Sequence, residues 1–211
     1  MLRIIIASFV MLSSVSAYAV FDGQLLIGKR YSSFNTDGLT GTDSDDGSEV
    51  TLSAHLDPIP FVPVAIGAYY TMVDYKLSDD GDAFPLDTFS GGHMGVELMA
   101  WTPALISNLS LFAKVGYSFY GAYTGEDKDY DAGEGILVDI DADYKLKDGS
   151  KYGIGIMWSP IAFVSALLEV NFSAEKIELD QYKAAGQTYS DVDTKTDLKS
   201  TSVLLGVSAG L

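Results

Sequence analysis

Residues 109–119, LSLFAKVGYSF, decide the fold because their side chains alternate between two kinds. One set is apolar or aromatic: Leu109, Leu111, Ala113, Val115, Tyr117 and Phe119. The other set is mostly small or polar: Ser110, Phe112, Lys114, Gly116 and Ser118. A period of two is typical of a β-strand whose two faces meet different surroundings. The stretch therefore predicts a strand with one continuous apolar face.

The same alternation recurs along the whole chain. It predicts eight strands, at residues 23–34, 48–57, 63–77, 91–102, 109–123, 150–159, 163–177 and 199–210. Three of their connections are short and nearly uncharged, LDPIPFVP (56–63), WTPALISN (101–108) and WSPIAFV (158–164), and the other four are long. Short turns that alternate with long loops are typical of an up-and-down barrel. We therefore predict an all-β, eight-stranded antiparallel up-and-down barrel.

Acidic residues gather in the long connections. The windows 37–49, 74–87, 126–148 and 175–197 hold five, five, nine and six of the 29 Asp and Glu residues. They are also rich in Gly, Ser and Thr, which is typical of loops. We therefore expect four long acidic loops at one end of the barrel.

The small number of charges within the predicted strands indicates which face of the barrel wall contacts lipid and which lines the lumen. A soluble barrel needs a charged outer wall, so we expect the apolar face to contact lipid and the small or polar face to line the lumen. A soluble two-sheet sandwich is the alternative. Aromatic residues would form two interfacial girdles. These are Trp101, Trp158, Phe61 and Phe163 beside the short turns, and Tyr70 and Tyr117 toward the acidic loops.

Charge, cysteine content and the first residues narrow the function class. A formal net charge of −16 argues against nucleic-acid binding, and the absence of cysteine excludes a disulfide-stapled fold. Residues 1–19 have a basic Arg3, an apolar core and a small-residue ending, Ala17-Tyr18-Ala19. This order predicts a cleaved signal peptide, with residues 20–211 as the barrel. A buried first strand or an uncleaved anchor is the alternative.

These features together resemble the small eight-stranded outer-membrane β-barrels, the family of the OmpA barrel domain, OmpX and OmpW. The resemblance covers residues 20–211 and includes the alternating last segment, STSVLLGVSAGL. It implies a place in the outer membrane of a Gram-negative bacterium, with the long loops at the cell surface. Family members usually end in an aromatic residue, whereas this chain ends in Leu211.

Strand parity predicts a small set of charged lumen residues: Arg30, His55, Glu97, Lys114 and Glu169. Glu97 and Lys114 belong to consecutive predicted strands, and the hairpin register places them nearly opposite each other as an ion pair. The simplest interpretation is a polar plug, since side chains can fill an eight-stranded lumen. A gated pore or proton relay is the alternative, and inward glycines such as Gly67, Gly153, Gly155, Gly206 and Gly210 would leave room for it.

The chain shows no strong catalytic or metal-binding motif. His93 and Ser90 lack the spacing of a barrel deacylase, and Asp127, Asp129 and Asp131 match an EF-hand loop only at its start. We expect no catalytic residue, cofactor or dedicated metal site. The expected partners are outer-membrane lipid and lipopolysaccharide, with divalent cations at the acidic loops, and the protein is expected to be monomeric. The preferred function is a structural or surface-interaction role, and the alternative is a narrow channel for small or hydrophobic molecules.

The stretch GEDKDYDAGEGILVDIDADYKLKDG (125–149) is the longest of the acidic connections. From Ile136 its even positions are apolar or small, and most odd ones are charged. We predict that the sixth strand extends through 136–147, with the even positions on the same side as Tyr152, Ile154 and Ile156. A separate hairpin turning at Asp148-Gly149 is the alternative.

Overall fold

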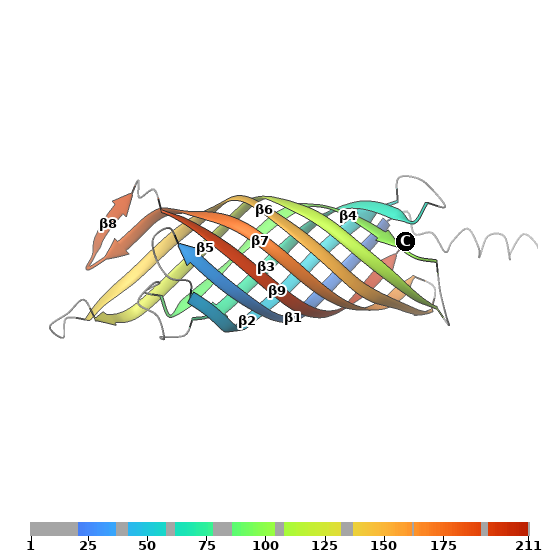
Figure 1. Cartoon of the computed structure of the whole chain (residues 1–211), viewed down its shortest axis with the longest axis horizontal. Coiled ribbons are helices and arrows are strands. Elements are labelled where there is room, and N and C mark those ends of the chain that lie inside the picture. Colours follow the sequence, from blue (N-terminus) through green and yellow to red (C-terminus); the bar gives the residue numbers. More distant parts are fainter. Residues whose placement is uncertain are drawn as a thin grey trace, which may run out of the picture.

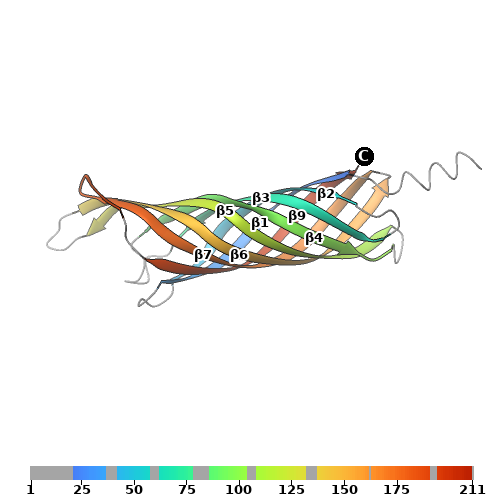
Figure 2. The same ribbon diagram turned by 90° about the horizontal axis from the view of Figure 1, so that it is seen from above.

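The computed structural model describes residues 21–36, 42–57, 62–77, 86–103, 108–131, 137–161, 163–190 and 194–210 (Figures 1 and 2). These ranges contain nine strands: β1 (Phe21–Thr36), β2 (Thr42–Leu56), β3 (Val64–Lys76), β4 (Thr88–Trp101), β5 (Leu109–Asp131), β6 (Leu137–Ile161), β7 (Val164–Ala184), β8 (Gln187–Ser190) and β9 (Lys195–Gly210). No helix in the described ranges has the length and hydropathy to cross a membrane. The predicted signal peptide, 1–19, and the predicted girdle residue Phe61 lie outside them.

Eight of the nine strands close into one antiparallel ring. Each strand from β1 to β7 pairs with the next, and β9 pairs with both β7 and β1. The short β8 pairs with the end of β7 and lies outside the ring. The predicted eight-stranded antiparallel barrel is confirmed.

The two ends of the barrel differ in the way the sequence predicts. Strands β2, β4, β6 and β9 end at one end, on the right in Figure 1, which we call the turn end. Strands β1, β3, β5 and β7 end on the left, and the β7–β8 hairpin lies there as well (Figure 1). We call this the loop end, because the acid-rich connections leave from it.

Side chains alternate between an apolar outer wall and a buried interior. Along β5, Leu111, Val115 and Tyr117 are exposed on the outer wall, whereas Phe112 and Lys114 are buried. Leu205 and Ile154, on the outer wall of β9 and β6, are 64% and 60% exposed. A continuous apolar band of this kind is destabilising in water and is expected where a barrel meets lipid. The prediction that the apolar face points outward is confirmed.

Three strands are much longer than a membrane crossing requires. β5, β6 and β7 contain 23, 25 and 21 residues, whereas a tilted strand crosses a bilayer in about 9–11. Their loop-end parts, 121–131, 137–147 and 176–184, project with β8 as what we call the projecting sheet (Figure 1). The prediction of loops was therefore wrong for 42–47, 126–131 and much of 178–197, which are strand.

The predicted extension of the sixth strand is confirmed, but its predicted orientation is wrong. Ala142, Tyr144 and Leu146 are buried, whereas Tyr152 and Ile154 are exposed on the outer wall. Between them, Leu146 pairs with Ile177 and Asp148 with Lys176, so that Lys147 is an extra residue in β6. One extra residue transfers every following side chain to the opposite face. The bulge therefore turns the apolar side of the projecting sheet inward.

A second bulge lies beside the first, on β5. Met94 of β4 pairs with Tyr120 and Gly95 pairs with Ser118, so that Phe119 is the extra residue. Phe119 and Tyr120 consequently both point outward, and the inward positions change from even to odd numbers. The two neighbouring strands thus change parity together, which keeps their apolar sides on one face of the projecting sheet.

Candidate functional site in the barrel interior

The five charged residues predicted from strand parity lie inside the barrel. Arg30, His55, Glu97, Lys114 and Glu169 are 2%, 1%, 2%, 4% and 0% exposed. They do not form a single cluster. His55, Glu97, Lys114 and Glu169 belong to a turn-side group, whereas Arg30 belongs to a loop-side group.

Lys114 is the centre of the turn-side group. Its Nζ donates hydrogen bonds of 2.8 Å to Oε2 of Glu169 and to Oε1 of Gln24, but it is 4.0 Å from Oε1 of Glu97. The predicted ion pair with Glu97 is thus present only at this longer distance. Glu97 is not nearly opposite Lys114, because the register sets Lys114 opposite Met99 and Glu97 opposite Gly116. The main partner of Lys114 is therefore on β7, two strands away.

Glu97 is held by two other residues. His55 Nε2 lies 2.8 Å from its Oε1, and Lys151 Nζ lies 3.6 Å from its Oε2. The Lys151 ammonium also lies 4.5 Å from the centroid of the Tyr69 ring, where a cation–π interaction is favourable. The sequence prediction omits Lys151, although its alternation with outward Tyr152 places it inside.

The loop-side group is built around Arg30. Its Nη1 lies 3.0 Å from Oε2 of Glu49, and its Nη2 lies 2.8 Å from Oε1 of Glu175. The Tyr123 hydroxyl donates to Oε2 of Glu175 at 2.5 Å, and His93 Nδ1 lies 2.9 Å from that hydroxyl. The sequence prediction omits Glu49 and Glu175. Both lie at the ends of the predicted strands 48–57 and 163–177, where these overlap the acidic windows, and each continues an inward column.

The two groups form one charged belt of nearly balanced charge. The described belt contains four glutamates, Glu49, Glu97, Glu169 and Glu175, against Arg30, Lys114, Lys151 and two histidines. Buried charges are costly unless they are paired, and losing one partner leaves an uncompensated charge. The pairing explains why the belt is compatible with a folded barrel.

A large apolar layer closes the belt on its loop side. Its buried residues are Phe34, Val73, Tyr75, Leu77, Leu86, Phe89, Tyr123, Ala142, Tyr144, Leu146, Ile177 and Leu198. Among the described residues, every ring strand except β2 contributes to it. Phe89 lies at its centre, with its ring centroid 5.2 Å from Phe34, 5.3 Å from Tyr123 and 5.6 Å from Tyr144.

The turn side of the belt is only partly apolar. Leu26, Met99, Phe112, Leu167 and Leu204 form a smaller buried cluster there. Beside it, His55 Nδ1 lies 3.8 Å from Oδ2 of Asp22, whose side chain is partly exposed. Ionisable groups thus lead from the turn end through Asp22 and His55 to Glu97.

The inward glycines Gly67 and Gly155 leave no free space beside them. A Cβ at Gly67 would lie 2.4 Å from Cδ2 of His55, and one at Gly155 would lie 2.4 Å from Cζ of Phe112. Such distances are far inside van der Waals contact. The idea that these glycines widen a passage was wrong, since each one admits a large side chain from a neighbouring strand.

The predicted girdle residues are mostly on the outer wall. Tyr70, Tyr117, Trp158 and Phe163 are exposed there. Trp101 is the exception, because it packs against the inner turn-side cluster. Its place in a girdle was a wrong prediction: Trp101 has the same parity as Glu97, which points inward.

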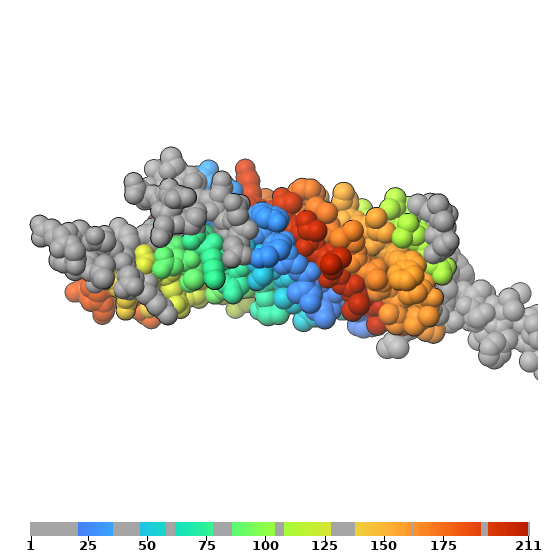
Figure 3. Space-filling model, turned by 90° about the horizontal axis from the view of Figure 1, so that it is seen from below, coloured from blue at the N-terminus to red at the C-terminus, as the bar shows by residue number. Residues whose placement is uncertain are grey.

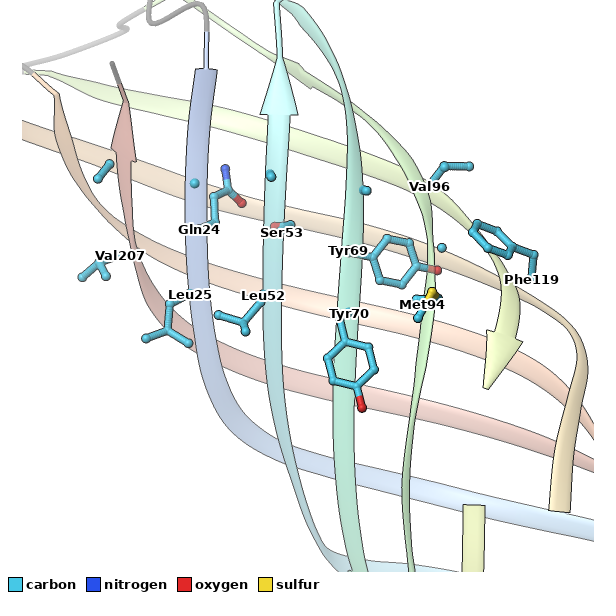
Figure 4. A pocket seen from close by; sticks show the side chains of 15 residues that line it. Gln24, Leu25, Leu52, Ser53, Tyr69, Tyr70, Met94, Val96, Phe119 and Val207 are labelled. Carbon is cyan, nitrogen blue, oxygen red and sulfur yellow. The ribbon is translucent and has the colours of Figure 1, made fainter. Parts of the chain in front are cut away.

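The outer wall carries a shallow groove inside the apolar band, with a volume of about 660 Å³ (Figure 4). Gly23 pairs with Ala54 and Ala209, and Ala54 pairs with Ala68, which sets small residues in one row. Leu25, Leu52 and Tyr70 form the neighbouring row and lie side by side in Figure 4. The groove is therefore a dent between rows of small and large residues, and lipid chains would cover it.

The two residues considered for catalysis lie on opposite faces. His93 is buried inside, whereas Ser90 is exposed on the outer wall. The described residues contain no group of three or more His, Cys, Asp or Glu side chains that could hold a metal ion. Asp127 and Asp131, from the EF-hand-like stretch, belong to strand β5.

No family model and no curated protein matches the sequence. Solved structures do match. Neisserial surface protein A is similar over 92% of this chain and 98% of its own, with a TM-score of 0.56 and 13% identity. The outer membrane protease OmpT from Escherichia coli is similar over 90% and 96%, with a TM-score of 0.54 and 9% identity.

A major outer membrane protein from Thermus thermophilus is similar over 90% of this chain and 99% of its own, with a TM-score of 0.50 and 10% identity. The chain has the fold of the outer-membrane β-barrels. The outer-membrane location predicted from the sequence is that of these structural neighbours. At these identities the likeness concerns the fold alone, and the neighbours include a protease, so it assigns no activity to this barrel.

Proposed function

We propose that the chain is a non-conducting, non-enzymatic barrel of the outer membrane, and that its working part is the projecting sheet at the loop end. The observation that carries the proposal is the loop-side apolar layer. Seven ring strands contribute buried side chains to it, and it separates the charged belt from the loop end. Ions pay a large desolvation cost in a layer of this kind.

The projecting sheet has the properties of a preformed interaction surface. Its buried side belongs to the loop-side layer, which fixes it to the barrel. On its exposed side Lys145 Nζ lies 2.6 Å from Oδ1 of Asp180, and Lys147 pairs with Glu178. A rigid, charged surface loses little entropy on binding and selects partners by charge.

Conductance across planar bilayers tests the proposal. The wild-type barrel should show no steady conductance, while Phe89→Ala combined with Tyr144→Ala should admit ions through the opened loop-side layer. Ile154→Ala, on the lipid-facing wall, is the control and should stay silent. A wild-type barrel that conducts steadily would contradict the proposal.

A narrow channel is the second candidate, and the polar chain from Asp22 through His55 to Glu97 favours it. In that case Glu97→Gln or Lys114→Met would change the conductance of a conducting wild-type barrel.

A lipid-modifying activity would alter lipid A in overexpressing cells, and His93→Ala would abolish the change. Unaltered lipid A is expected.

A further inference from the structure

The outer wall has a second hollow at its loop end, where β1, β9, β7 and β6 lie side by side (blue, red and orange in Figure 3). The register sets their outward residues in rows. Tyr31 pairs with Thr201, Thr201 with Phe172, and Phe172 with Tyr152. The three rings are about half exposed, so this row is a stretch of aromatic girdle interrupted by one hydroxyl.

The next row toward the loop end consists of small residues and one lysine. Ser33 and Ala174 both pair with Lys199, and Ala174 also pairs with Ser150. Because small side chains follow large rings, a hollow of about 540 Å³ opens between the rows, lined by Tyr31, Phe172 and Lys199 among others. The lysine chain is the one long side chain of this row.

The hollow lies at the boundary between the apolar band and water. On its turn side the next row is Lys29, Val203, Val170 and Ile154, and on its loop side the next row is Asn35, Asp197, Lys176 and Asp148. Aromatic rows of outer-membrane barrels lie at the level of the lipid headgroups. A headgroup is therefore what the hollow meets.

The charge of the hollow is positive in a strongly acidic chain. Lys199 is exposed and has no ion pair or hydrogen bond within the described residues, in contrast to Lys145 and Lys147, which pair with acids on β7. Asp197 is the nearest acid along β9, but it lies opposite Lys176. The Lys199 ammonium is thus available to an anion.

We propose that this hollow binds the phosphate-bearing sugar headgroup of an outer-leaflet lipid of the lipopolysaccharide class. Lys199 would pair with the phosphate, a group that lysine binds as a point charge. The hydroxyls of Ser33 and Thr201 would accept and donate hydrogen bonds to the sugar, while Tyr31 and Tyr152 offer it their ring faces. The assignment rests on the proposed function only for the orientation, with the loop end outside the cell.

Native mass spectrometry of the detergent-solubilised barrel tests the assignment. The probes are bisphosphorylated lipid A, the same lipid without its phosphates, and inorganic phosphate. We expect one retained lipid A molecule. Removal of the phosphates, or Lys199→Ala, should weaken retention about tenfold or more, the usual effect of losing a charge-assisted hydrogen bond.

Three controls separate the site from general charge effects. Lys199→Arg should retain the lipid, and Lys145→Ala, which removes the same charge from the projecting sheet, should leave retention unchanged. Heat-modifiable migration on gels checks that each variant is folded. Equal retention by Lys199→Ala, equal binding of the phosphate-free lipid, or displacement of the lipid by an equal concentration of inorganic phosphate would overturn the assignment. None of these results depends on conductance, so a conducting barrel would refute the proposed function alone.

Discussion

Lys114 on β5 and Glu169 on β7 meet across the intervening strand β6, with 2.8 Å between Nζ and Oε2 and with both side chains fully buried. Gly153 of β6, opposite Lys114, makes the contact feasible. A Cβ there would lie 2.7 Å from Oε1 of Glu169 and 2.4 Å from Oδ1 of Asn171. A glycine on the middle strand thus allows side chains of its two neighbours to join into one belt.

Replacing Lys114 should be among the most damaging single changes in the barrel. Lys114→Met leaves Glu169 without its closest cation in a buried site, which costs about 3–5 kcal/mol. Urea unfolding in lipid vesicles measures the loss. Adding Glu169→Leu should restore much of the stability, because both buried charges are then absent. An exposed pair gives the control: Lys145→Met should cost less than about 1 kcal/mol. Equal losses at Lys114 and Lys145 would contradict the importance of the buried pair.

Gly153→Ala tests the close packing of the belt directly. The added methyl group meets Oδ1 of Asn171 and Oε1 of Glu169. Because the other oxygen of Glu169 is held by Lys114 in a fully buried site, we expect a loss of about 1–3 kcal/mol. Gly23→Ala is the matched control, since the nearest atom to its Cβ would be 3.9 Å away. Its stability should be unchanged or raised by less than about 1 kcal/mol. A tolerated Gly153→Ala would mean that the belt is looser than these distances imply.

The bulge at Lys147 makes a prediction about the projecting sheet. Deleting Lys147 restores unbroken alternation in β6, which would turn Tyr144 and Leu146 outward and remove them from the loop-side layer. Amide hydrogen exchange should then become fast over 137–146 and stay slow over 150–158. Lys147→Ala keeps the extra residue and should preserve the protection. Retained protection in the deletion variant would show that the bulge does not set the orientation.

The fold could be predicted from the sequence because every second residue of a strand in a membrane barrel contacts lipid and is therefore apolar. The columns that contain Val115 and Leu205 identify the outer wall. Alternation along each strand then places Arg30 and Glu169 inside. Parity gives the face of a residue but not its partners, because these depend on the tilt and stagger of the strands. This is why Lys114 was paired with Glu97 although its nearer partner is Glu169.

The sequence predictions that the structure contradicts have two physical origins. Bulges at Phe119 and Lys147 shift the period by one residue, and no residue type in the sequence signals such a shift. Acidic composition also resembles a loop, which concealed the strand at 126–131 and beyond residue 177. It also drew attention away from Glu49 and Glu175, which lie where predicted strands overlap acidic windows. Acid-rich strands form here because the charges are paired, and pairing between distant strands is a tertiary property that local composition does not contain.

Tyr144 gives the projecting sheet a predictable response to alkaline pH. Burial in the loop-side layer raises the pKa of its hydroxyl well above the ordinary value of a tyrosine, about 10 in the unfolded chain. The contribution of the Tyr144 hydroxyl to the free energy of unfolding is therefore fully present below that ordinary pKa. It falls as pH rises above it, because the unfolded chain then releases a proton that the folded sheet retains. Tyr144→Phe keeps the ring and removes the titration, so its stability curve should stay flatter above pH about 10. Urea unfolding followed across this pH range compares the two proteins, with exposed Tyr189→Phe as the control. Parallel curves for wild type and Tyr144→Phe would show that the Tyr144 hydroxyl ionises as it does in water.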